Sequence, residues 1–179
     1  MNEIVGRREA IVTAFSEWTA FCAARRGRSS EMLYPLIRKP EYSEILRAAH
    51  VSQDEFEKWH AKSTMAIHDA SEERLSVGWG AKLINVYLKT RVYIARDFCS
   101  SNLIEFIHPP IDNMLVNNIR RMYGNRREIW QKISIFSSIA GISDYSSYRQ
   151  IIDGCREIAK ERQCLLIEVD ELWQPVSRV

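Results

Sequence analysis

Hydrophobic side chains recur every three or four residues over the first part of the chain. Ile11, Phe15, Trp18 and Phe21 have this spacing, with polar and charged positions between them. Apolar residues at such intervals share one side of a helix, so the pattern predicts an amphipathic helix over residues 3–25. The periodicity then lapses, and residues 25–40 are expected to form a loop that carries five basic residues and one acid.

Two capping signals place further helices. Ser52 and Glu55 form a capping box, which predicts a helix from there to about Arg74. Asp112 follows a Pro-Pro pair, which would end any preceding helix. The aspartate is the predicted N-cap of a helix over residues 111–123. Gly124 is the expected stop for that helix.

The rest of the chain also favours helix. A tight turn at residues 78–80 is followed by an apolar run that predicts a helix from near Ala81, and helical runs cover 126–140, 145–161 and 163–174. Period-two alternation, the mark of a half-buried strand, is not sustained anywhere. We therefore predict an all-α fold, a compact multi-helix domain with a helix-hairpin-helix motif at about residues 66–91.

Composition narrows the fold class further. The chain has 179 residues, 46% of them hydrophobic, with only seven glycines and five prolines, which suits one helical domain over residues 1–179. The four cysteines are widely spaced, so a disulfide scaffold, a zinc ribbon or an iron–sulfur cluster is not expected. The first 25 residues lack a signal-peptide pattern and no apolar stretch could span a bilayer, so a cytoplasmic protein is expected.

The segment Gly78-Trp79-Gly80-Ala81-Lys82 carries the candidate chemistry. Two glycines one residue apart between helices predict a sharp hairpin with bare backbone N–H groups at a helix N-terminus, a site for a phosphate. An ordinary turn between helices is the competing interpretation of the glycines.

Two side chains favour a functional site over an ordinary turn. Lys82 is expected on the first turn of the following helix, where the helix dipole and partial burial favour its neutral, nucleophilic amine. Asp112 brings a carboxylate to the start of another helix, where it could also be an N-cap alone.

Together these residues resemble the helix-hairpin-helix DNA glycosylases of the endonuclease III and 8-oxoguanine glycosylase superfamily. Gly78, Gly80 and Lys82 are in register with the two hairpin glycines and the catalytic lysine of that family, and Asn85 continues the match. Pro110-Ile111-Asp112 corresponds to its second signature. The resemblance covers residues 78–123 directly.

The resemblance implies base excision from double-stranded DNA that contains a damaged or modified base, as in DNA repair. The enzyme would flip the nucleotide out of the duplex. Lys82 would attack C1′ and form a Schiff base, with associated lyase activity, and Asp112 would activate the amine and stabilise the charge on the sugar. A monofunctional variant, in which Asp112 activates water, stays open, and so does a hypermodified viral base as the target.

Other residues are candidates for contact with DNA. Four arginines without an acid among them, which could grip the DNA backbone or simply be solvated, are Arg120, Arg121, Arg126 and Arg127. Gly78, Gly80 and Ala81 are the backbone candidates at the hairpin. Trp79, His108 and Met114 are the candidates for the base pocket or a wedge, although Trp79 is more simply expected to pack inward and His108 to be structural. Trp59, Trp130 and Trp173 are expected in the core.

The expected partners and cofactors follow from this interpretation. We expect a monomer that binds duplex DNA and no membrane, without a metal or iron–sulfur cluster, although a monovalent ion could sit at the hairpin. The alternatives are a non-catalytic helix-hairpin-helix module that binds DNA, and a helical interaction protein in which Gly-x-Gly is only a turn.

Overall fold

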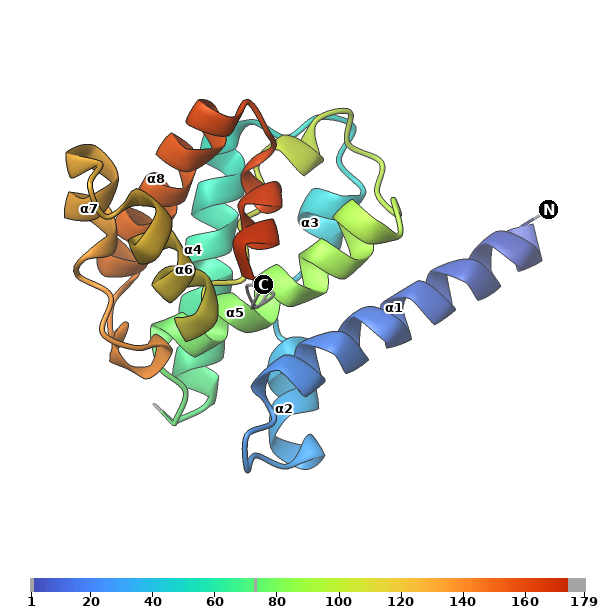
Figure 1. Cartoon of the computed structure of the whole chain (residues 1–179). Helices are drawn as coiled ribbons and strands as arrows, with labels where there is room; N and C mark the ends of the chain where they lie inside the picture. The colour runs from blue at the N-terminus through green and yellow to red at the C-terminus, as the bar shows by residue number, and fades with distance from the viewer. Residues whose placement is uncertain (1, 73, 174–179) are drawn as a thin grey trace, which may run out of the picture.

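The computed structural model describes residues 2–72 and 74–173, where every regular element is a helix and no strand occurs (Figure 1). Side chains are described from residue 6 onward in this range. The all-α prediction is therefore confirmed. No helix in the described ranges has both the length and the apolar character needed to cross a bilayer.

Helix α1 (Asn2–Ala24) lies where the hydrophobic pattern predicts it. Only part of its apolar face is covered: Ala20 and Ala24 are buried, whereas Ile11, Phe15 and Trp18 are at least half exposed. Figure 1 shows α1 along one side of the protein, and its amino-terminal half is held there because Arg8 donates to Ala95 O at 2.9 Å and Glu9 pairs with Arg47.

The expected loop at residues 25–40 is wrong, because it contains helix α2 (Ser30–Ile37). Ser29 is the N-cap and accepts a hydrogen bond from the Met32 amide. Leu33, Leu36 and Ile37 are buried, so tertiary packing stabilises a helix that Pro35 and the charged flanks concealed. A short helix α3 (Ser43–Leu46) follows.

Helix α4 (Gln53–Ala70) begins with the predicted capping box of Ser52 and Glu55. A short connection leads to α5 (Val77–Leu88), which packs against α4 and α1. Nearly all of α5 is buried, so it is the central helix of the fold (Figure 1). It continues directly into a π-helix, η1 (Lys89–Ile94).

The second half of the chain surrounds α5. A 3₁₀ turn, η2 (Leu103–Glu105), leads to α6 (Asn113–Tyr123), which begins after Asp112 and ends at Gly124 as predicted. Helix α7 (Arg127–Ile133) is shorter than the predicted run to 140, since the chain turns into a 3₁₀ segment, η3 (Ile139–Gly141). The last elements are α8 (Tyr145–Arg162) and the 3₁₀ helix η4 (Leu166–Trp173); residue 174 of the predicted final run lies outside the described residues.

Two apolar clusters meet at α5. One combines α2, α3 and α4 with residues such as Leu83 and Ile84, and the other combines α6, α7, α8 and η4 with Val77 and Ala81. Because α5 contributes to both, its side chains are held in place from several directions.

Candidate functional site

Lys82 and Asp112 come together although 30 residues separate them in sequence. Lys82 Nζ lies 3.2 Å from Asp112 Oδ2, and the two side chains are 11% and 20% exposed. Helix α5 begins at Val77, so Lys82 lies in its second turn and not in the first turn as predicted. The sequence prediction that these two residues share one site agrees with this geometry.

Asp112 is both an N-cap and a partner of Lys82. Its Oδ1 accepts the Leu115 amide at 3.0 Å, which fixes the carboxylate at the first turn of α6. The other oxygen, Oδ2, is left to face Lys82. The capping interpretation and the functional interpretation of Asp112 are therefore compatible.

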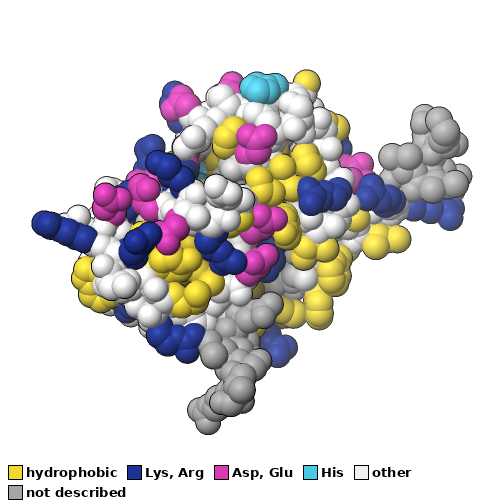
Figure 2. Space-filling view, turned by 45° about the horizontal axis from the view of Figure 1, so that its top comes forward, with side chains coloured by type: hydrophobic (Ala, Val, Ile, Leu, Met, Phe, Trp, Pro, Cys, Tyr) yellow, Lys and Arg dark blue, Asp and Glu magenta, His cyan; other side chains and the backbone are white. Residues whose placement is uncertain are grey.

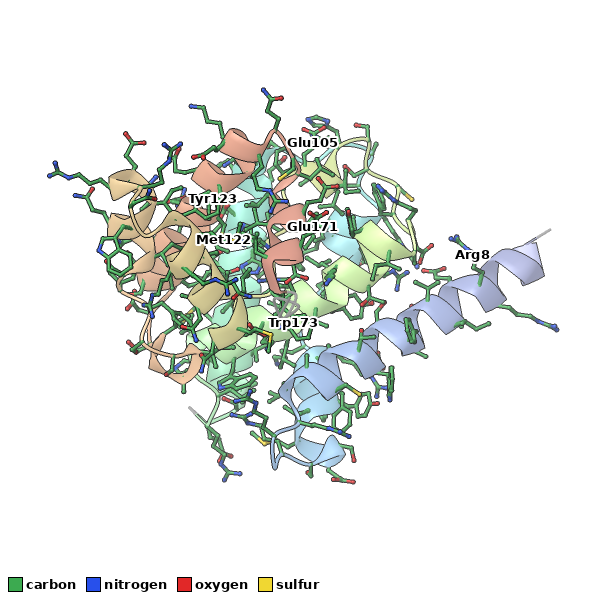
Figure 3. All side chains as sticks on the ribbon, in the orientation of Figure 1. Arg8, Glu105, Met122, Tyr123, Glu171 and Trp173 are labelled. Atoms are coloured by element: carbon green, nitrogen blue, oxygen red, sulfur yellow. The ribbon has the colours of Figure 1, made fainter. Side chains whose placement is uncertain are left out.

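Trp173 is a further member of the site that the sequence pattern did not reveal. Its indole Nε1 donates to Asp112 Oδ2 at 2.9 Å, and its ring is 44% exposed, so the expectation of a core position is wrong. It is the last residue of η4, and in Figure 3 it lies over α5 beside α1. No local motif signals a contact between residues 61 positions apart.

A cavity of about 450 Å³ adjoins the Lys82–Asp112 pair. Its lining combines residues of α1, α5, η1 and η4 with Pro110 and Asp112: Thr19, Ala23, Arg26, Lys82, Val86, Lys89, Thr90, Ile94, Pro110, Asp112, Asp170 and Trp173. A largely apolar wall with a few convergent charged groups is typical of a small-molecule or base-sized site.

The cavity has more positively charged than negatively charged side chains in its lining. Lys89 pairs with Asp170, and burial raises the pKa of Asp170 although Lys89 opposes that effect. Arg26 is exposed and forms no ion pair with any described residue. The cavity therefore has a surplus of positive charge at the end of α1, where it could attract an anion.

The glycine turn differs from the expected hairpin. The Gly78 amide donates to Ile142 O at 3.1 Å, the Trp79 amide to Ser76 Oγ at 3.4 Å and the Gly80 amide to Ser76 O at 3.0 Å. The prediction of bare amides is wrong, and Gly78, Gly80 and Ala81 are all buried in the first turns of α5.

The glycines serve close packing. A Cβ on Gly78 would lie 2.4 Å from Ile139 O and 2.9 Å from Ile142 Cβ, and one on Gly80 would lie 3.2 Å from Thr64 O. Small residues are needed there because α5 approaches the backbone of its neighbours closely.

The three candidates for a base pocket or wedge lie apart from the cavity. Trp79 is 5% exposed, with the Arg28 guanidinium 4.5 Å from its ring centre, so its expected inward packing is confirmed. His108 is fully buried. Met114 is 42% exposed on α6 and does not line the cavity.

The four predicted arginines differ in their contacts: two bind other parts of the protein, and two do not. Arg120 donates to the carbonyl oxygens of Ile133 and Phe136 and so supports the end of α7. Arg126 pairs with Glu161 at 2.7 Å. Arg121 and Arg127 are exposed and form no ion pair with a described residue, which leaves them available to an external anion.

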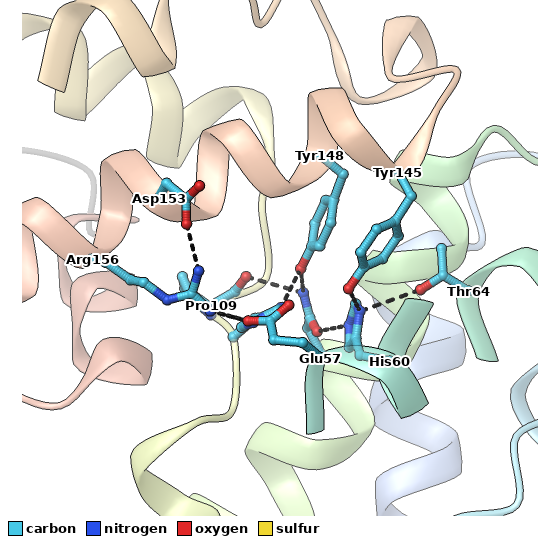
Figure 4. A network of polar contacts seen from close by, with 10 residues as sticks. Glu57, His60, Thr64, Pro109, Tyr145, Tyr148, Asp153 and Arg156 are labelled. Atoms are coloured by element: carbon cyan, nitrogen blue, oxygen red, sulfur yellow. Dashed lines mark hydrogen bonds and ion pairs between the residues drawn. The ribbon is translucent and has the colours of Figure 1, made fainter. Parts of the chain in front are cut away.

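A second polar cluster joins α4, α5, α8 and the segment at Pro109, and we call it the closed cluster because its central residues are fully buried (Figure 4). Its members are Glu57, His60, Asn85, His108, Tyr145, Tyr148 and Arg156. Asn85, one turn after Lys82 on α5, donates to Pro109 O at 3.2 Å and to Tyr148 Oη at 2.8 Å. Its Oδ1 lies 2.9 Å from His60 Nε2. Asn85 therefore ties α5 to the segment that leads to Asp112.

The histidines of this closed cluster are uncharged. Burial, with a contribution from His108, lowers the pKa of His60 from 6.5 to about 3, and burial also lowers the pKa of His108. His108 Nε2 lies 3.1 Å from Glu57 Oε1. Burial opposes ionisation of Glu57, but His108 and Arg156 outweigh it and hold the Glu57 pKa at about 2.

Comparison with known proteins adds no relative: no protein family, curated protein or solved structure matches the chain. Within residues 2–72 and 74–173, no group of three or more His, Cys, Asp or Glu side chains is arranged to hold a metal ion. The functional argument therefore depends on the residues of the site itself.

Proposed function

We propose that the chain is a DNA glycosylase that excises a damaged or modified base, with Lys82 as nucleophile and Asp112 as its acid–base partner. The observation that carries this proposal is the 3.2 Å contact between Lys82 Nζ and Asp112 Oδ2 beside the cavity of about 450 Å³. Two residues chosen from the sequence for joint chemistry are neighbours in space, and there is room beside them for a base.

The first step requires a free amine. Asp112 Oδ2 takes a proton from the Lys82 ammonium, which leaves the amine lone pair free to attack C1′ of the target deoxyribose. The C1′–N bond breaks, and the base leaves with the bonding electrons and takes up the proton that Asp112 had accepted, which returns Asp112 to its carboxylate form. The sugar is then bonded to Lys82 Nζ through C1′.

The second step forms the Schiff base. The Asp112 carboxylate takes a proton from the positively charged Nζ and passes it to O4′. The lone pair that this frees on Nζ expels O4′ from C1′, the ring opens, and an iminium links the sugar to Lys82. Loss of a proton from C2′ then eliminates the 3′ phosphate, which cleaves the strand. The Asp112 carboxylate stabilises the positive charge that develops in both steps.

The surroundings suit this chemistry. Trp173 holds Asp112 Oδ2 through its indole N–H and presents a ring at the cavity, where a flipped base could stack. Arg26 supplies the unpaired positive charge that a flanking phosphate needs. DNA contact would thus depend on the turn that follows α1 and not on bare amides at the glycine turn.

Base release from a panel of duplexes, each containing one modified base, tests the proposal. We expect release from at least one duplex and a loss of about a hundredfold or more for Asp112→Asn. Asp170→Asn is the matched control, because Asp170 lines the same cavity but pairs with Lys89. It should retain most of the activity.

Two results would contradict the proposal. Release that is unchanged in Asp112→Asn would remove Asp112 from the chemistry. Salt-dependent binding of duplex DNA without release from any substrate, and without a covalent adduct on abasic DNA, would instead indicate a non-catalytic DNA-binding module.

A further inference from the structure

The outward side of α1 carries a row of three large hydrophobic side chains. Ile11, Phe15 and Trp18 are 70%, 50% and 51% exposed, and we call these three residues the α1 row. The opposite side of the helix packs on the protein body through Ala20 and Ala24. A helix with apolar residues on both sides is normally covered on both, so the α1 row indicates a binding surface.

Two members of the α1 row form an aromatic stack. The ring centres of Phe15 and Trp18 are 5.7 Å apart, with an angle of 23° between the ring planes. Because both rings are half exposed, a further flat ring can extend the stack from the solvent side. Exposed aromatic side chains of this kind are the surfaces on which nucleic-acid bases stack.

The aromatic stack adjoins the cavity of the candidate site. Phe15 and Thr19 are four residues apart and therefore share one side of α1, and Thr19 lines the cavity. The Thr19 and Thr90 hydroxyl groups lie 2.9 Å apart and join this side of α1 to η1. Ile94 of η1 also lines the cavity and is 61% exposed. An apolar surface thus continues from the cavity onto α1.

The charges near the α1 row favour an anionic partner. Arg25 and Arg26, in the turn that follows α1, are exposed and form no ion pair with any described residue. Glu9 and Glu17 of α1 already pair with arginines at the ends of α3 and α2. In Figure 2, hydrophobic side chains lie beside Lys and Arg side chains on the right, where α1 runs. Exposed cations beside aromatic rings bind the phosphates and the bases of a single strand.

Two other partners fit the α1 row less well. A second copy of the chain would bring arginines close to arginines in either orientation, because arginine pairs stand on both sides of the row, at residues 7–8 and 25–26. A bilayer surface requires an apolar helix face of several turns. The α1 row extends over only about 10 Å of the helix axis.

We propose that the outward side of α1 binds single-stranded DNA, with bases stacked on Phe15 and Trp18 and backbone phosphates bound by Arg25 and Arg26. The strand follows α1 to the cavity of the candidate site. A target nucleotide beside an unpaired stretch of DNA therefore reaches Lys82 more readily than one in a continuous duplex. This link to excision rests on the proposed function, whereas binding of an unmodified strand does not.

Fluorescence anisotropy of the full chain with a labelled, unmodified oligothymidylate tests the site. We expect saturable binding that weakens as the salt concentration rises. Trp18→Ala should weaken binding about tenfold or more, because one stacking ring is lost, and Trp18→Phe should retain most of the affinity. Trp130→Ala is the matched control, since Trp130 is similarly exposed but belongs to α7, and it should bind normally.

Two further measurements separate the stacking from the charge. Arg25→Gln should reduce the slope of log affinity against log salt concentration by about 0.7, the value for one phosphate of a single strand. Pairing the oligothymidylate with its complement should weaken binding and abolish the effect of Trp18→Ala, because the bases then stack on one another. The melting temperature of Trp18→Ala should stay the same, since Trp18 belongs to neither apolar cluster.

Several results would overturn the proposal. They are an absence of oligothymidylate binding and an affinity that Trp18→Ala leaves unchanged. A dimer in the analytical ultracentrifuge that Trp18→Ala dissociates would show that a second copy covers the α1 row. Sedimentation with phosphatidylserine vesicles, without oligothymidylate binding, would assign the row to a membrane surface. Because the oligothymidylate contains no modified base, none of these results depends on whether the protein releases a base.

Discussion

The Lys82–Asp112 pair and the closed cluster around His108 are built on the same two segments but differ in their access to space. Lys82 and Asn85 are one turn apart on α5, and His108 and Asp112 lie on the chain that enters α6. The Lys82–Asp112 pair adjoins a cavity of about 450 Å³, whereas His108 and Asn85 are 0% exposed. Charged side chains beside a cavity can contact a substrate, whereas polar side chains buried in the core can only stabilise the fold.

The closed cluster also supports the Lys82–Asp112 pair. Asn85 donates to Pro109 O, and this bond joins α5 to the segment that carries Asp112. The closed cluster thus sets the distance between Lys82 and Asp112. Four predictions test whether the two clusters have these separate roles.

The largest effect is expected from Lys82→Ala. Borohydride trapping of the protein on an abasic duplex should fall by about a thousandfold or more, because no other amine is paired with Asp112 in the described structure. The melting temperature should change little, since the side chain is at a cavity wall. Lys89→Ala is the control: it lines the same cavity but pairs with Asp170, and it should still be trapped.

In the closed cluster, Glu57→Gln should cost about 2 kcal/mol of unfolding free energy, because a neutral amide replaces the buried carboxylate that faces His108 and Arg156, although Arg156 keeps Asp153 as a second anionic partner. Denaturant unfolding measures this loss. Glu105→Gln, at an exposed position, should have almost no effect. A stable Glu57→Gln protein that has lost trapping would reverse the roles assigned to the two clusters.

Acidification should weaken the closed cluster first. His60 has a pKa of about 3 in the folded protein against 6.5 ordinarily, so the unfolded chain binds a proton that the folded protein does not between these values. The stabilisation is complete above pH 6.5 and is lost as the pH falls toward 3. At pH 5, His60 alone should cost about 2 kcal/mol.

Denaturant unfolding from pH 7 to pH 4 measures this slope. His60→Gln should flatten it, and His50→Gln, at an exposed site, should not. Below about pH 4.5 the loss should steepen, because Glu57, with a pKa of about 2, also begins to bind protons in the unfolded chain. Equal slopes in the His60→Gln and unmodified proteins would show that His60 does not titrate on unfolding.

The smallest effect is expected from Trp173→Phe, which keeps a ring at the cavity but loses the N–H donated to Asp112 Oδ2. Trapping should fall by about threefold to tenfold, in line with the loss of one hydrogen bond to a carboxylate. Trp130→Phe is the control, because Trp130 is similarly exposed but does not line the cavity. Equal rates for both variants would remove Trp173 from the site.

Local signals predicted much of the fold. The capping box at Ser52 and the N-cap at Asp112 both occur as expected, because each depends on hydrogen bonds within a few residues. Helix α2 was missed because it is stabilised by distant packing. The amides at Gly78 and Gly80 were misjudged for the same reason, since Ile139 and Ile142 approach α5 from far along the chain.

The candidate site was predicted only in part. Lys82 and Asp112 could be selected by residue type and spacing, but Trp173 and Arg26 join them through tertiary contacts alone. The closed cluster was equally invisible, because His60, His108 and Tyr148 belong to three separate segments. Long-range geometry decides which polar residues meet and whether a cavity lies beside them.

The most direct test of the central claim is to identify the lysine that bonds to DNA. The protein is reduced with borohydride on an abasic duplex, digested, and mapped by mass spectrometry. We predict that the sugar remnant lies on Lys82 in the unmodified protein and that no adduct forms in Lys82→Ala. An adduct on Lys89 or another lysine, or none in the unmodified protein, would contradict the assignment of Lys82 as the nucleophile.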